Sequence, residues 1–332
     1  MSVTILDKEI GPIGYGLMGL TWRPPHLLPS TQQAFAAMSA ALASGANFWN
    51  GGEIYGTPSR NSLHLLAEYF DKYPEAADKV LLSIKGGVVP GTHQPDGSAA
   101  GVRRNIDECN RILGGRKKVD IWECARVDPN TPIEDTVKAL AELVKEGLIG
   151  GIGLSEVKAS TIRRAAKIHP IAAVEVELSI WATDILHNGV AEACAELGIP
   201  IVAYSPLSRG MLTGEAPKRN ADLPENLRGY PKFQDDVLQG NMRLTEEVEK
   251  LAKQKGVTVA QMAIAWVRGM SGRGGLGVIV PIPGATTEAR VLENTKDVRL
   301  TEEEMQEIDE ILKKNKVVGE RYGGPVAKLS EG

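Results

Sequence analysis

The feature that most constrains this chain is the alternation of short apolar runs with longer segments of helical periodicity, which continues from one end to the other. Eight such pairs can be counted along the sequence. This alternation is typical of βα units on a parallel sheet, and eight units can close a (β/α)8 TIM barrel. The sequence therefore predicts an α/β fold, a single barrel domain over residues 1–332 with an extra C-terminal helix.

The predicted strands are Pro12 to Leu17, Ala46 to Asn50, Val80 to Lys85, Val119 to Trp122, Gly150 to Leu154, Ala172 to Val176, Ile199 to Tyr204 and Gly277 to Val280. The predicted helices are Thr31 to Ser44, Asn61 to Lys72, Ala99 to Leu113, Pro132 to Glu146, Ala159 to Lys167, Gly189 to Leu197, Leu244 to Lys255 and Thr287 to Asn294. Thr301 to Lys313 is predicted as the extra helix, and residues 317–332 as a polar tail.

Composition excludes several classes of protein. Hydrophobic residues make up 42% and charged residues 24%, the balance of an ordinary globular protein. The net charge of −4 argues against nucleic acid and membrane surfaces as partners. Three widely spaced cysteines indicate neither disulfides nor a metal site. Without a signal-peptide pattern, the sequence predicts a cytoplasmic protein, with access to the nucleus left open.

Two polar residues lie where predicted strands end. Tyr55 follows the run Phe48 to Ile54, and Lys85 ends the run Lys79 to Ile84. If the two strands are neighbours in a barrel, both side chains emerge at its C-terminal rim, where barrel enzymes assemble their chemistry. An ammonium beside a phenol favours the phenolate, so we expect Lys85 to lower the pKa of Tyr55 and make it a proton donor near neutral pH.

The longest irregular stretch, Ser205 to about Gln239, follows the seventh predicted strand. Loops of this length without secondary structure are usually functional or mobile. The start of the loop, Ser205 to Gly214, offers hydroxyls, backbone amides and a guanidinium, which suit a pyrophosphate. A plain surface loop is the alternative.

Ordered segments along the whole chain resemble the aldo-keto reductases, and within them the fungal pyridoxal reductases. The segments are Gly14 to Gly19, Phe48 to Gly56, Lys85, Cys124 to Glu134, Gly153 to Ser155, Tyr204 to Leu207 with Gly210 and Leu212, and Pro281 to Thr286 with Arg290, Glu293 and Asn294. The resemblance implies a (β/α)8 barrel that binds NADPH without a Rossmann domain and reduces aldehydes or ketones by hydride transfer.

The resemblance also assigns cofactor contacts residue by residue. It implies that Tyr204 stacks on the nicotinamide, that Ser155 binds the carboxamide, and that Arg290 meets the adenosine 2′-phosphate. The residues implied at the pyrophosphate are Ser205, Leu207, Ser208 and Gly210, and those at the adenine are Glu293 and Asn294. The planar fork of donors on Arg290 suits a phosphate, although a solvated helix residue is the alternative.

Only half of the family's catalytic group of Asp, Tyr, Lys and His is present. Tyr55 and Lys85 match, whereas Asn50 stands at the aspartate position and Ala125 at the histidine position. We expect the Asn50 carbonyl to accept a hydrogen bond from Lys85 and to hold it. Losing a donor to the carbonyl oxygen typically costs about 10²-fold or more in rate. Pyridoxal, whose own phenol lies beside the aldehyde, is the substrate that best compensates.

Two further departures from the family pattern concern the nicotinamide. The carboxamide-binding amides of the family are replaced by Glu156 and Glu175. Ionised carboxylates near the ring favour the cationic oxidised nicotinamide. The alternative is that Glu156 points to solvent and only Glu175 faces the ring.

The sequence thus predicts an NADPH-dependent reductase, with pyridoxal first among its substrates and other aromatic aldehydes or ketones as the alternative. Trp22, Trp49, Trp122 and Arg126 are candidates for a flat, polar-edged substrate pocket, with ordinary core packing as the other interpretation of each tryptophan. The halved catalytic group leaves an NADPH-binding regulatory subunit as a second hypothesis, and a Schiff-base aldolase acting through Lys85 as a third. A monomer or weak homo-oligomer is expected.

Overall fold

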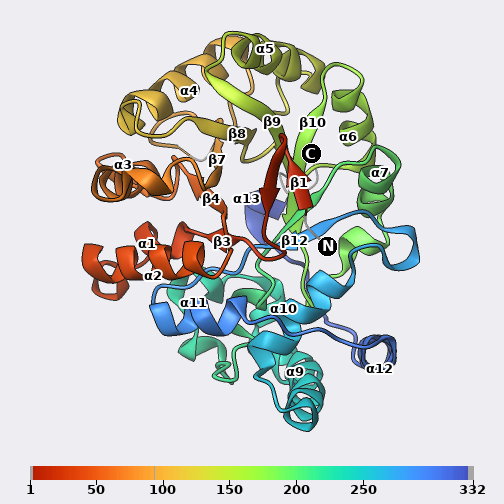
Figure 1. Cartoon of the computed structure of the whole chain (residues 1–332). Helices are drawn as coiled ribbons and strands as arrows, with labels where there is room; N and C mark the ends of the chain where they lie inside the picture. The colour runs from red at the N-terminus through yellow and green to blue at the C-terminus, as the bar shows by residue number, and fades with distance from the viewer. Residues whose placement is uncertain (1–2, 93, 328–332) are drawn as a thin grey trace.

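In a computed structural model, which describes residues 3–92 and 94–327, the chain forms the predicted barrel. Eight parallel strands lie in the order β12-β11-β10-β9-β8-β7-β4-β3, and helices surround them (Figure 1). The two ends of this order meet, because the backbone amides of Gly14 and Gly16 donate to the carbonyls of Pro281 and Pro283. The predicted fold class is therefore confirmed.

Each barrel strand overlaps a predicted one. The strands are β3 (Tyr15–Gly16), β4 (Phe48–Gly52), β7 (Leu81–Gly86), β8 (Val119–Cys124), β9 (Ile149–Ser155), β10 (Ile171–Glu177), β11 (Ile201–Tyr204) and β12 (Ile279–Pro281). The longer helices are α2 (Thr31–Ala43), α3 (Ser62–Lys72), α4 (Ala99–Leu113), α5 (Ile133–Lys145), α6 (Ala159–Ala166), α7 (Val190–Glu196), α9 (Asp235–Lys255), α10 (Val259–Gly269), α11 (Glu288–Thr295) and α12 (Glu302–Lys314).

Polar residues fix where many helices begin. The side chains of Ser30, Asn61, Ser98, Thr258 and Thr301 each accept a hydrogen bond from a backbone amide in the first turn of the helix that follows. These bonds satisfy donors that have no partner within the helix. The caps therefore set the lengths of the loops that carry the strand ends.

An N-terminal hairpin, β1 (Val3–Ile5) and β2 (Lys8–Ile10), was not predicted and covers one end of the barrel. Ile5 and Ile10 are buried there with barrel residues such as Phe48 and Leu81. Figure 1 shows the hairpin in dark red in front of the strands. It covers the floor of the barrel, so the opposite end is the mouth.

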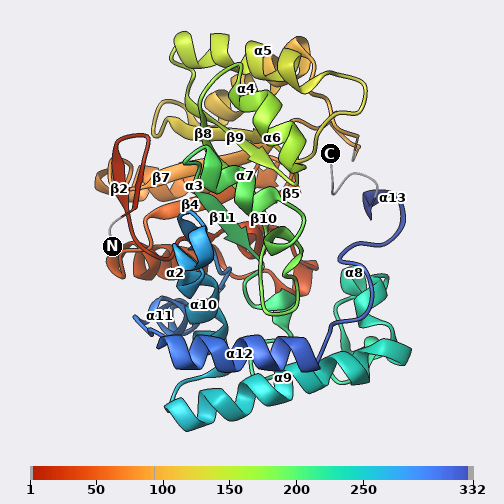
Figure 2. The same ribbon diagram turned by 90° about the vertical axis from the view of Figure 1, so that its right-hand side faces the viewer.

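The region after β11 differs from its prediction. It contains the short helix α8 (Glu225–Arg228), and α9 begins at Asp235 rather than Leu244. Helix α10 was missed altogether because residues 259–267 are all buried, so the segment has no polar face to mark a helical period. Figure 2 shows α9 alongside α12, the extra helix that the sequence predicted.

The chain after α12 returns toward the mouth and includes the short helix α13 (Gly324–Ala327), as Figure 2 shows. Asn241 of α9 holds this segment by two hydrogen bonds to the backbone of Val318, of 2.8 and 2.9 Å. Residues 328–332 of the predicted tail lie outside the described residues. Over the described parts of the chain, no helix is both long and apolar enough to cross a membrane.

Candidate active site

Strands β4 and β7 are neighbours, and their register places Gly52 opposite Lys85. Tyr55 lies three residues beyond this point, in the loop after β4. Only 8% of Tyr55 and 5% of Lys85 are exposed. The structure thus brings the two residues to the same end of the barrel, in a site largely shielded from water.

The ammonium of Lys85 is held by carboxylates rather than by Asn50. Its Nζ donates to Oε1 of Glu175 on β10, and Oε1 of Glu123 on β8 lies 3.9 Å away. The Asn50 amide nitrogen donates to the other oxygen of Glu175. Within the described residues, Asn50 therefore reaches Lys85 only through Glu175, and the expected direct hydrogen bond is wrong. Glu123 was not singled out from the sequence.

Burial and charge set the protonation of this group. Burial by itself lowers the pKa of Lys85, but Glu175, Tyr55 and Glu123 together raise it above its ordinary value. Burial, followed by the neighbouring Glu175, raises the pKa of Glu123 well above its usual range. The structure therefore favours a charged lysine, and it favours the neutral form of Glu123 more than water would.

The expected lowering of the Tyr55 pKa is wrong for the structure as it stands. Burial raises the pKa of Tyr55 to about 12, with further upward contributions from Glu175 and Glu123. Lys85 and then Arg126 lower it, so the predicted effect of the lysine has the right sign but is outweighed. The consequence is a tyrosine that keeps its proton at neutral pH, as a proton donor must.

The predicted aromatic pocket is only partly present. Trp22 stacks on Tyr55, with ring centroids 5.6 Å apart, and is 46% exposed. Trp49 and Trp122 are fully buried in the main core. Successive side chains of a strand point to opposite faces. Since Asn50 and Glu123 face the barrel interior, the tryptophan before each must face the helices, and their assignment to the substrate pocket is wrong.

Arg126 lies beside these groups, half-buried. Its Nη1 donates to the carbonyl of Ala125 at 2.6 Å, and its guanidinium lies 5.4 Å from the ring centroid of Tyr322. No carboxylate pairs with it in the part of the chain that the structure describes, and its Nε has no partner there. Arg126 is therefore a cation with one buried donor, Nε, that no described group satisfies.

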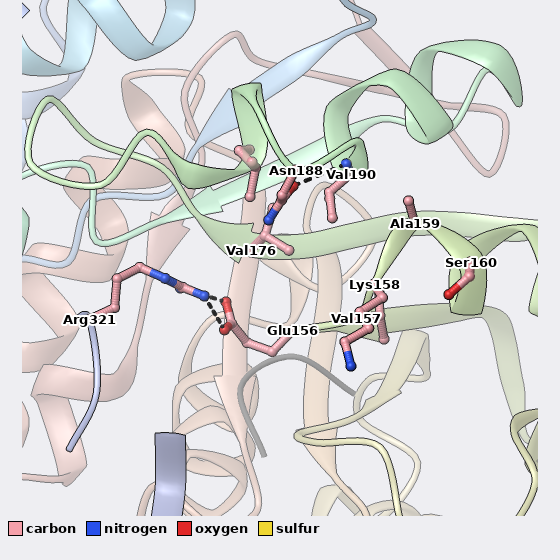
Figure 3. Close-up of a pocket in the computed structure, with 10 residues that line it drawn as sticks. Glu156, Val157, Lys158, Ala159, Ser160, Val176, Asn188, Val190 and Arg321 are labelled. Atoms are coloured by element: carbon pink, nitrogen blue, oxygen red, sulfur yellow. Dashed lines mark hydrogen bonds and ion pairs between the residues drawn. The ribbon is translucent and has the colours of Figure 1, made fainter. Parts of the chain in front are cut away.

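A second buried cluster adjoins the first. The Tyr204 hydroxyl donates to Glu156 at 2.9 Å and contacts the Tyr322 hydroxyl at 2.5 Å. Arg321 donates to Glu156 at 3.0 Å, as Figure 3 shows. Lys85 Nζ lies 5.4 Å from the centroid of the Tyr204 ring, which joins the two clusters. Glu156 is 1% exposed, so the alternative in which it points to solvent is wrong.

Glu177 anchors the second cluster. It accepts contacts from Arg209 at 3.2 Å, Arg321 at 3.3 Å and Lys232 at 3.4 Å. Burial alone raises the pKa of Glu177, but these cations lower it to about 2. Reasoning from the sequence missed Glu177, Arg321 and Tyr322, because nothing in the polar tail indicates that it returns to the mouth.

A cavity of about 340 Å³ opens beside this cluster. Glu156 and Arg321 lie at one side of it (Figure 3). The other lining residues are Val157, Lys158, Ala159, Ser160, Val176, Ile185, Asn188 and Val190. Ser155 is 1% exposed, and its hydroxyl has no hydrogen-bond partner among the described atoms. An unsatisfied hydroxyl in this place fits a bound polar group such as a carboxamide.

The other residues assigned to a cofactor lie along β11 and α11. Ser205 and Ser208 have left-handed backbone, with φ of 51° at each, and such turns orient amides toward an anion. The Ser208 hydroxyl donates to Ser179 at 2.9 Å and is buried, and the Ser208 amide donates to the Ser205 carbonyl at 2.9 Å within the turn. Arg290 is paired with Glu293 at 2.8 Å and Glu215 at 3.1 Å. Of the remaining residues, Leu207 is half-buried, Gly210 has a φ of 106° and Asn294 is 5% exposed.

Two fungal proteins are similar to this chain over nearly its whole length. The "Probable pyridoxal reductase 2" of Schizosaccharomyces pombe is 42% identical over 323 residues, covering 95% of each chain. The "Putative pyridoxal reductase" of Saccharomyces cerevisiae is 38% identical, covering 97% of this chain and 99% of the yeast protein.

A glycerol dehydrogenase from Gluconobacter oxydans has the same fold, with a TM-score of 0.81 and 22% identity over 97% of this chain and 98% of that one. The model of the Aldo/keto reductase family matches residues 12–313. The chain therefore belongs to the aldo/keto reductase family, whose members use NAD(P)H, and it is an oxidoreductase that acts on aldehydes or alcohols.

Proposed function

We propose that the protein reduces pyridoxal to pyridoxine with NADPH, and that Tyr55 is the general acid. The observation that carries the proposal is the buried phenol of Tyr55 at the barrel mouth, protonated at neutral pH and within the electrostatic influence of Lys85. The names of the two fungal relatives direct the choice of substrate toward pyridoxal.

The cofactor would be held by residues already placed around the mouth. Tyr204 would lie against the nicotinamide and Ser155 would bind its carboxamide, while the backbone of residues 205–210 would line the pyrophosphate. Arg290 would bind the adenosine 2′-phosphate, which is the reason to propose NADPH rather than NADH. When bound, the cofactor supplies the hydride that the aldehyde carbon accepts.

The protein itself supplies the proton and the surroundings. Tyr55 donates its proton to the carbonyl oxygen, and the charged Lys85 stabilises the phenolate that remains. Trp22 offers an aromatic face beside Tyr55. Because Ala125 provides no donor, the phenol of pyridoxal polarises its own aldehyde, and the positive charge of Arg126, which lowers the pKa of Tyr55, also favours the phenolate that remains.

Steady-state NADPH oxidation with a panel of aldehydes tests this proposal. We expect turnover with pyridoxal, slower turnover with 3-deoxypyridoxal, and a loss of about 10²- to 10⁴-fold in kcat for Tyr55→Phe, which removes only the proton. Equal rates with the two pyridoxals would exclude help from the substrate phenol. Tight NADPH binding without turnover of any aldehyde would instead support the regulatory-subunit hypothesis.

A further inference from the structure

Four side chains from four different strands converge on one buried charge. Lys85 of β7 donates to Glu175 of β10, Asn50 of β4 donates to the other oxygen of Glu175, and Glu123 of β8 lies 3.9 Å from the ammonium. None of the four is more than 5% exposed. A lysine removed from water in this way needs a charged partner to stay protonated.

Glu175 is the partner that the geometry selects. Its carboxylate is directly hydrogen-bonded to the ammonium, whereas Glu123 stands beyond hydrogen-bond distance and its pKa is raised by burial and then by Glu175. Both oxygens of Glu175 are engaged, one by Lys85 and one by Asn50. The carboxylate is therefore fixed in position.

Asn50 completes this arrangement because its amide nitrogen is a donor. An aspartate at the same place would put a second carboxylate against Glu175, and like charges at this distance disfavour one another strongly. The carboxylate that is hydrogen-bonded to Lys85 thus stands on β10 instead of β4. The two departures from the family pattern, Asn50 and Glu175, compensate for each other.

We propose that Glu175 is a positioning residue that keeps Lys85 charged and directed at Tyr55, with Asn50 orienting Glu175. The charge that the family pattern places at position 50 is supplied here from position 175. This inference rests on the proposed role of Tyr55 as the general acid. It assigns Glu175 to the proton-donating group instead of to the nicotinamide carboxamide.

A charge-swap series tests the assignment. Glu175→Gln should lower kcat with pyridoxal by about 10²-fold, because an amide removes the carboxylate that is hydrogen-bonded to Lys85. Asn50→Asp should also be slow, because it adds a second carboxylate. The double variant Asn50→Asp/Glu175→Gln restores one carboxylate beside Lys85, and we expect it to recover at least about 10-fold over Glu175→Gln. Glu196→Gln, an exposed glutamate on α7, is the matched control.

The pH profile provides a readout that a purely structural role would not move. The titratable groups that face Lys85 are Glu175, Glu123, Tyr55 and Tyr204. Glu175 is the largest of the charges that raise the pKa of Lys85 against its burial. Without it the pKa of Lys85 falls, and the alkaline limb of kcat should move to lower pH by about one unit or more. The double variant should return the limb toward its original position.

Urea unfolding of the wild type, the two single variants at positions 50 and 175 and the double variant separates this inference from the proposed function. Glu175→Gln should lower the unfolding midpoint and the double variant should raise it again, whether or not any aldehyde is turned over. If the effects of the two substitutions simply add, in both kcat and unfolding midpoint, Glu175 is not the charge partner of Lys85 and the inference is overturned. If the wild type turns over no aldehyde but the double variant regains the unfolding midpoint lost in Glu175→Gln, only the proposed function is wrong.

Discussion

At the scale of single residues, the buried charges decide most of what is particular to this barrel. Lys85 and Glu177 are each surrounded by groups of opposite charge at the mouth, and both are 5% exposed or less. Breaking such a pair from one side leaves an uncompensated charge in a low-dielectric place. The loss of stability caused by a substitution here therefore depends on which charged partners it leaves unpaired.

Glu177→Gln strands the cations Arg209, Lys232 and Arg321, and we expect it to lower the free energy of unfolding by about 3 kcal/mol at pH 7. The pKa of Glu177 is about 2 in the folded protein and about 4.3 when unfolded. A lowered pKa contributes stability that is full above the unfolded value and is lost as the pH falls toward the folded value.

Urea unfolding from pH 7 down to pH 3.5 measures this dependence. The difference between wild type and Glu177→Gln should be constant above about pH 5 and begin to shrink below about pH 4. Glu196→Gln, which alters only an exposed pair with Arg163, should change stability by less than about 0.5 kcal/mol. A difference that grows on acidification would contradict the assigned charge state.

Individual site residues could be predicted from the sequence when their chain position was informative. Tyr55 and Lys85 were found because each follows an apolar run, and strand ends of a barrel meet at one rim. The contact between Lys85 and Glu175 could not be found, because 90 residues separate them and only the closed ring of strands brings them together. The net pKa of Tyr55 was missed for a related reason, since burial outweighs the lysine.

At the scale of elements, prediction succeeded where a local signal existed. Strands and most helices were located from apolar runs and caps such as Ser30 and Thr301. Helix α10 lacked such a signal because it is buried on all sides, and the short hairpin β1–β2 has too few residues to show a period. The sequence alone did not show which other elements each helix or strand would pack against.

Thr301 gives an element-scale prediction. Its hydroxyl accepts a hydrogen bond from the backbone amide of Glu304, and the Glu304 carboxylate accepts one from the backbone amide of Thr301. The two bonds form a capping box at the start of α12. Thr301→Ala should cost about 1 kcal/mol of unfolding free energy, while Thr301→Ser keeps the hydroxyl and should cost little. Chemical denaturation of both variants measures this. Equal losses would show that the methyl group, not the cap, matters.

At the scale of the whole molecule, the barrel separates stability from chemistry. The hairpin closes the floor with Ile5 and Ile10, whereas all the candidate catalytic groups lie at the mouth. Barrels commonly divide their two ends in this way. A substitution at the floor should therefore change how easily the protein unfolds without changing how it binds or turns over a substrate.

Ile10→Ala tests this separation. Ile10 is 2% exposed, so removing its side chain should cost about 2–5 kcal/mol, while Ile10→Val should cost about 0.5–1.5 kcal/mol. Both variants should keep the wild-type kcat and KM at temperatures where they are folded. Thermal melts and kinetics on the same samples measure the two quantities, and a changed KM in a folded variant would refute the separation.

The shared carboxylate of Glu177 links two distant parts of the chain. Arg209 belongs to the segment after β11 and Arg321 to the segment after α12, and both end on the same oxygen. Each segment therefore keeps its place at the mouth through an ion pair with the same buried strand residue. A ligand that displaces either segment must separate an arginine from a carboxylate that is only 1% exposed, where an unpaired charge is costly.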